Sequence, residues 1–115
     1  MLVTGDTFWN GAYPFIDTVC GGSIDGMIEA AETSLRYVTD KTLIVPGHGS
    51  VANRAQLLEF RDMLVSIRGN VARLKKEGKS LEQVIAAKPT AAFDEKWGKF
   101  VIDPAFFTRL VYRGV

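Results

Sequence analysis

The fold of this chain is decided by the stretch Leu43-Ile44-Val45-Pro46-Gly47-His48-Gly49. It predicts a short buried strand that stops at a proline and presents the only histidine of the chain between two glycines. The segment Leu2-Val3-Thr4-Gly5-Asp6 has the same design, because it runs from apolar residues through a glycine to a carboxylate. We therefore predict that Asp6 and His48 are two ligands of one metal site, whose other ligands are absent from this chain.

Working outward, residues 1–6 are predicted to form a strand, and residues 42–45 a second one. Between them, Ser23 is a candidate N-cap for a helix that runs to about Val38, with apolar residues at helical spacing on one face. The order strand, helix, strand predicts a crossover unit that places both strands in one sheet. Residues 6–22 are expected to form a long loop, rich in turn signals and in large apolar side chains.

The second half of the chain is predicted to be helical. Asn53 with Gln56 forms a capping box for a long helix ending near Gly78. Ser80 with Gln83 forms another, and opens a short helix that Pro89 closes. Residues 90–102 are mixed and are expected to dock on the core. A last helix follows Asp103-Pro104, so we regard residues 90–115 as a C-terminal helical extension.

The inventory of four helices and two strands suits an α/β domain that is helix-rich with few strands. A sheet needs roughly three or more strands and a covered face to be stable by itself. Residues Met1-Leu2-Val3 already lie in the middle of a strand pattern, without a polar lead-in. We therefore expect residues 1–115 to be a single partial domain, in which half of a sheet is missing.

Composition narrows the classes of partner. Lys and Arg number 14 against 13 Asp and Glu, a net charge of +1, so the chain lacks the electrostatic footprint of a nucleic-acid or membrane-surface protein. A single cysteine allows no intrachain disulfide and no multi-cysteine metal cluster. No transmembrane stretch or targeting segment is present in the chain as given, and the sequence names no compartment.

Both candidate ligands have a simpler interpretation. A lone Gly-His-Gly is more often a surface turn, and an aspartate after a glycine is usually a turn or cap residue. The metal interpretation gains weight because the same strand-end design occurs twice, and the ends of neighbouring strands meet in one cleft. A carboxylate with an imidazole suits zinc, iron or manganese, although two ligands are too few for a complete zinc site.

Other residues near Asp6 are weaker candidates. Trp9, Tyr13 and Phe15 either wall a substrate cleft or pack in the core. Cys20 is a possible ligand or reactive thiol, and more often such a residue is simply packed. Two further carboxylates, at Asp17 and Asp25, are interpreted as loop and cap groups.

Taken together, three motifs resemble the C-terminal half of a metallo-β-lactamase-fold hydrolase. They are Thr4-Gly5-Asp6-Thr7, then Tyr13-Pro14-Phe15-Ile16-Asp17 with Gly21-Gly22-Ser23, and Val45-Pro46-Gly47-His48-Gly49. The resemblance covers residues 1 to about 65. It implies a four-layer αβ/βα sandwich that holds two metals, often zinc, at one edge. It also implies that Asp6 bridges the two metals and that His48 is a ligand of the second.

The chain departs from that family in one large respect. The family's His-x-His-x-Asp-His motif and a further histidine cannot be present, because this chain contains one histidine in total. The resemblance thus implies a fragment of a metal-dependent hydrolase that cleaves a small-molecule ester, thioester, lactam or phosphodiester. We expect the chain alone to be inactive. The alternative is a non-catalytic association module that pairs with an N-terminal half or with itself.

Overall fold

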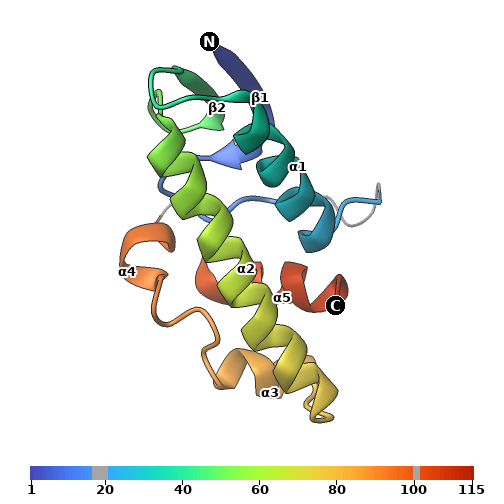
Figure 1. Ribbon diagram of the computed structural model, residues 1–115. Coiled ribbons are helices and arrows are strands. Elements are labelled where there is room, and N and C mark those ends of the chain that lie inside the picture. The colour runs from blue at the N-terminus through green and yellow to red at the C-terminus, as the bar shows by residue number, and fades with distance from the viewer. Residues whose placement is uncertain (17–20, 100–101) are drawn as a thin grey trace.

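The computed structural model describes residues 1–16, 21–99 and 102–115. Within them the chain has a mixed α/β fold that is rich in helix and poor in strand, as predicted. The seven elements are, in order, β1 (Leu2–Trp9), α1 (Ile24–Tyr37), β2 (Ile44–His48), α2 (Arg54–Lys76), α3 (Leu81–Ala86), α4 (Asp94–Trp97) and α5 (Pro104–Arg113). In Figure 1, α2 runs along the molecule, with the two strands near one end and α3 at the other. None of the helices in the described residues is long and apolar enough to cross a bilayer.

The predicted crossover unit is confirmed. β1 and β2 pair in parallel, with Leu2 opposite Ile44 and Trp9 opposite His48, and α1 connects them. On its other side, Ile44 exchanges two backbone hydrogen bonds with Ala52, of 2.8 and 2.9 Å. This parallel pairing brings the last residues of both strands to the same edge of the sheet.

The helix starts are also as predicted. Four residues occupy N-cap positions and accept a hydrogen bond from a backbone N–H of the first turn: Ser23, Asn53, Ser80 and Asp103. Gln56 and Gln83 complete the two capping boxes by accepting from the backbone N–H of Asn53 and Ser80. Because the side chains satisfy backbone donors that a helix start leaves unpaired, local sequence alone fixes these positions.

The strand ends differ from the prediction. β1 continues to Trp9 instead of ending at Asp6, and β2 extends from Ile44 to His48 instead of stopping at Val45. Pro46 lies inside β2, at a place where the ladder is irregular and a missing N–H is tolerated. Asp6 is therefore a residue within a strand, and His48 is the last residue of a strand.

The region after Pro89 contains one helix more than predicted. The extra helix is α4, a single turn whose N-cap position, at Phe93, makes no side-chain hydrogen bond, so the sequence carries no start signal for it. Trp97 at its end is buried in the core, as expected. Phe100 and Val101, which were expected to dock nearby, lie outside the described residues.

The C-terminal segment is anchored on the core by Tyr13. Its ring stacks on Phe107 of α5, with 4.7 Å between centroids. Its hydroxyl donates to Asp94 Oδ1 at 2.7 Å and lies 3.2 Å from the carbonyl oxygen of Thr90. Residues 90–99 and 102–115 therefore share the core of the rest of the chain.

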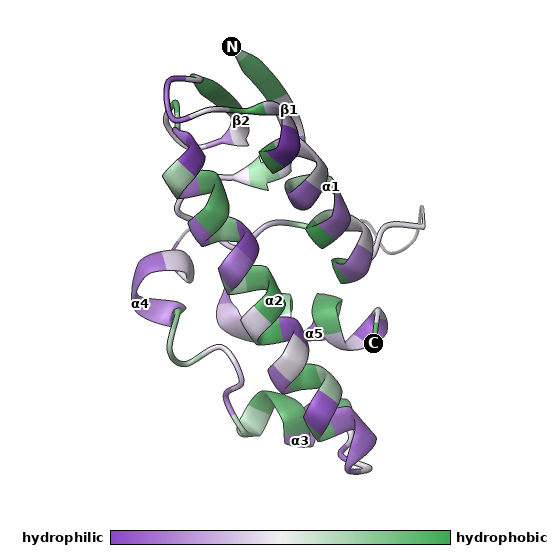
Figure 2. Ribbon diagram, in the orientation of Figure 1, coloured by the Kyte–Doolittle hydropathy of each residue, from purple (hydrophilic) through white to green (hydrophobic). Residues whose placement is uncertain are grey.

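The helices cover one face of the two-stranded sheet and leave the other open. Side chains alternate between the faces of a strand, so buried Ile44 faces the helices while its neighbours Leu43 and Val45 face away. Val3, opposite Val45, is 65% exposed, and Leu43 is 60% exposed. We call this the outer sheet face, comprising Met1, Val3, Leu43, Val45 and Val51. Figure 2 shows the first parts of both strands as apolar.

Candidate metal centre

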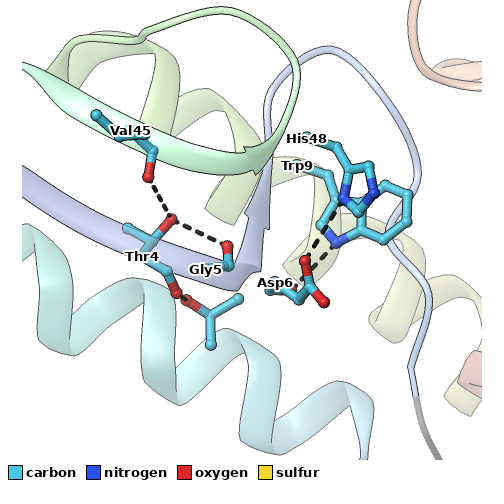
Figure 3. A network of polar contacts seen from close by, with 7 residues as sticks. Thr4, Gly5, Asp6, Trp9, Val45 and His48 are labelled. Atoms are coloured by element: carbon cyan, nitrogen blue, oxygen red, sulfur yellow. Dashed lines mark hydrogen bonds and ion pairs between the residues drawn. The ribbon is translucent and has the colours of Figure 1, made fainter.

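The carboxylate of Asp6 is placed by an irregularity in β1. The four steps from Gly5 to Trp9 lie opposite only two steps of β2, from Pro46 to His48. The surplus residues bulge from the ladder, and Gly5 permits the turn with a φ of +59°. Such bulges re-aim side chains. Here the bulge turns Asp6 toward the end of β2 (Figure 3).

Asp6 and His48 meet, as the sequence predicts. Asp6 Oδ1 lies 3.5 Å from His48 Nδ1. The side chain of Asp6 is 77% exposed and that of His48 is 39% exposed, so the carboxylate is open to solvent while the imidazole is partly covered. The two residues are 42 positions apart in sequence, and the parallel pairing of β1 with β2 brings them together.

The imidazole is covered by Trp9. The two rings stack with 3.7 Å between centroids and 25° between planes. The indole Nε1–H donates to the backbone carbonyl of Asp6 at 3.1 Å. A single side chain, 5% exposed, therefore contacts both predicted ligands.

The two glycines around His48 are required by space. A Cβ on Gly47 would lie 2.4 Å from Asp6 Oδ1 and 2.6 Å from the carbonyl oxygen of Gly5. Gly49 has a φ of +94°, and a Cβ there would lie 2.4 Å from the carbonyl oxygen of Asn10. These two glycines therefore allow the end of β2 to lie close to Asp6 and to the residues that follow β1.

The arrangement is compatible with a bound metal ion. Two ligand atoms on one tetrahedral zinc, each about 2.0–2.1 Å from it, lie roughly 3.3 Å apart. The 3.5 Å between Asp6 Oδ1 and His48 Nδ1 is close to that spacing and longer than a good hydrogen bond. The carboxylate can lie this close to the end of β2 because Gly47 has no side chain. Oxygen with imidazole nitrogen suits zinc, iron and manganese.

A third ligand is not supplied by the part of the chain that is described. Across residues 1–16, 21–99 and 102–115, no group of three His, Cys, Asp or Glu side chains could hold a metal ion. Asp17 and Cys20 fall outside these residues. Asp25 lies elsewhere, in an ion pair with Arg68 of α2 in which the Nε–Oδ1 distance is 2.6 Å, and this contact raises the pKa of the Arg68 guanidinium.

A cleft of about 510 Å³ opens beside Asp6 and reaches the start of α1. Phe15, 44% exposed, lies in its wall, as predicted, and so does an edge of the mostly buried Trp9. His48 does not line this cleft; it borders a smaller hollow of about 90 Å³ near Asn10.

Tyr13 follows the second of its two predicted alternatives, because it packs in the core and does not line the cleft. It is fully buried, and its ring and hydroxyl are both engaged in the core. The apolar side of α5 and the carboxylate of Asp94 together hold it away from the site. Burial, and then the hydrogen bond and charge of Asp94, raise the pKa of its hydroxyl above the usual range.

Sequence reasoning missed the contacts of Trp9 with both ligands. The signal that could have found them is the register, because residues opposite each other on neighbouring strands have adjacent side chains. The register depends on the bulge after Gly5, and no local sequence motif predicts that bulge. Asn10 was also missed; its backbone N–H donates to the carbonyl of His48 at 2.9 Å.

The sequence of this chain matches no protein-family model, and no curated protein matches it. The roles of Asp6 and His48 therefore rest on their geometry and on the motif resemblance described above.

Proposed function

We propose that this chain contributes part of the metal centre of a metallo-β-lactamase-like hydrolase, with Asp6 and His48 as two of the ligands. The observation that carries the proposal is their meeting at one sheet edge, 3.5 Å apart, although 42 positions separate them in sequence. Gly47 supports the same interpretation, because its missing side chain lets the Asp6 carboxylate approach the end of β2. The finer assignment to a four-layer αβ/βα sandwich rests on the motif resemblance.

In this proposal Asp6 and His48 would help to hold the metal, most simply a pair of zinc ions, which when bound would supply an activated water for the cleavage of an ester, thioester, lactam or phosphodiester. The resemblance implies that Asp6 would be the carboxylate shared by the two ions, and its side chain, 77% exposed, is open to solvent. His48 is a ligand of one ion. The cleft beside Asp6, with Phe15 in its wall, is where a small-molecule substrate would lie.

The chain alone is expected to be inactive. A catalytic zinc takes three protein ligands and a water, and the only histidine here is His48. The histidines that the resemblance implies would have to come from a separate or preceding segment. The proposed hydrolase activity therefore belongs to the complete metal site, and the chain alone is expected to lack it.

The test is metal analysis with a panel of hydrolase substrates, applied to this chain alone and to the chain joined to a segment that carries His-x-His-x-Asp-His. We expect activity and about two zinc ions per chain only in the joined form. A matched control is the joined form with Asp6→Asn and His48→Ala, which should lose both. Retention of two zinc ions by the chain alone, or activity that survives the control substitutions, would refute the proposal.

A second candidate function is supported by the outer sheet face. Its members are apolar and uncharged, and large exposed apolar surfaces commonly mark contact sites. A two-stranded sheet is also small for independent stability. On this proposal the chain is a non-catalytic association module, which pairs with an N-terminal half or with a second copy through that face.

A further inference from the structure

We propose that Trp9 is a positioning residue for the metal-ligand pair, holding His48 with its ring face and Asp6 with its indole N–H. The inference deepens the proposed function and rests on it. Its basis is one side chain that touches both predicted ligands, in two different ways (Figure 3).

The first contact restrains the imidazole. Trp9 and His48 are opposite each other in the parallel ladder, so the β1–β2 register brings their side chains together. With 3.7 Å between centroids and 25° between planes, the indole lies across one face of the imidazole. A ring held in this way has little freedom to rotate about its side-chain bonds, and its nitrogens keep fixed directions.

The second contact restrains the carboxylate through its backbone. The Trp9 Nε1–H donates to the carbonyl of Asp6 at 3.1 Å. That carbonyl belongs to the bulge after Gly5, where the sheet ladder is irregular. The indole therefore adds a hydrogen bond to the backbone in the irregular part of the ladder. It ties the strand bulge that carries Asp6 to the ring that covers His48.

Outer groups that orient metal ligands typically change metal affinity by 10- to 100-fold when removed. Trp9 fits that class, because it is 5% exposed and lies behind the ligands, with only an edge reaching the cleft. Its two contacts are separable by substitution. Phenylalanine keeps a ring face and removes the N–H, whereas leucine removes both and keeps an apolar side chain.

The experiment follows the imidazole proton signals of His48 by NMR while Zn²⁺ is added at fixed pH. His48 is the only histidine, so its signals need no separation from others. Wild type is compared with Trp9→Leu, Trp9→Phe and Phe8→Leu. Phe8 is the matched control, because it is a buried aromatic residue of the same strand that packs on Phe60 instead.

We expect the upfield ring-current shift of His48 to vanish in Trp9→Leu before any zinc is added, and to survive in Phe8→Leu. Zinc affinity should fall about tenfold or more in Trp9→Leu and less in Trp9→Phe, and Phe8→Leu should keep it. If Trp9→Leu does not fold, Trp9→Phe decides, because it should lower the affinity through the lost N–H alone.

The proposal is overturned if the Trp9 variants that fold bind zinc as wild type does, or if Phe8→Leu weakens zinc binding as much as they do. A different result overturns the proposed function, namely wild-type His48 signals that do not respond to zinc. In that case the ring-current comparison without metal still decides whether Trp9 positions His48.

Discussion

At the scale of single residues, the site depends on the missing side chain of Gly47 as much as on the side chains of Asp6 and His48. Gly47 has no side chain, and this lets the carboxylate of Asp6 lie against the end of β2. The sequence identified His48 and Asp6 because each follows a run of apolar residues and a glycine, although Asp6 lies within β1 and not at its end. It could not identify the partner of Tyr13, because that hydroxyl meets Asp94, 81 positions away, through the packing of α4 and α5.

Gly47→Ala should destabilise the fold by about 1–3 kcal/mol, because the added methyl overlaps Asp6 Oδ1 and the backbone of Gly5. Chemical denaturation measures the change. The matched control is Gly69→Ala in α2, where a Cβ meets nothing within 4 Å. There the better helix propensity of alanine should raise stability by about 1 kcal/mol. Equal effects at the two positions would contradict the proposed contact.

Tyr13→Phe should lower stability near neutral pH by about 1–2 kcal/mol, because it keeps the stack on Phe107 and loses the hydrogen bonds of the hydroxyl. The folded protein raises the pKa of Tyr13, so its stabilising contribution is full below about pH 10 and is lost as the pH rises above it. Denaturation curves at alkaline pH should thus fall less steeply for Tyr13→Phe than for wild type. Parallel curves would show that folding does not raise the pKa of the Tyr13 hydroxyl.

At the scale of elements, local signals located the helices well and the strand ends poorly. The capping pairs at Asn53 and Ser80 act within four residues, so the sequence contains all of the physics that sets those helix starts. The ends of β1 and β2 depend on pairing between Trp9 and His48, which is a contact between distant segments. The short α4 escaped prediction because it has no cap residue.

Asn53→Ala should cost about 1 kcal/mol, because it removes the acceptor for the backbone N–H of Gln56 and breaks the capping box. Ser66→Ala, on an exposed face of the same helix, is the control and should not lower stability. Thermal unfolding followed by circular dichroism distinguishes the two. A neutral effect of Asn53→Ala would mean that tertiary packing alone fixes the start of α2.

At the scale of the whole molecule, a sheet of two strands sits at one end of an elongated body of 44 × 26 × 22 Å. The sequence predicted the two strands, and their small number led to the prediction of an incomplete domain. What it could not predict is which face of the sheet the helices would cover. The alternation around Ile44 settles this, leaving Val3 and Leu43 exposed on the other face.

If the outer sheet face mediates association, Val3→Lys should shift the chain toward the monomer in sedimentation velocity, because a charge on that face opposes its burial. Tyr37→Lys is the matched control, since Tyr37 is a large residue on α1 that is 79% exposed and lies outside that face. It should leave the distribution unchanged. A wild-type chain that sediments only as a folded monomer would argue against the association module.

The central claim is that Asp6 and His48 bind one metal together, and the most direct test is the zinc response of the single histidine. Zn²⁺ should shift the His48 ring signals of the wild-type chain weakly but saturably. Asp6→Asn should reduce the affinity by at least about tenfold, whereas Asp25→Asn, a carboxylate engaged with Arg68, should not. Unresponsive His48 signals, or equal affinities in wild type and Asp6→Asn, would contradict the claim.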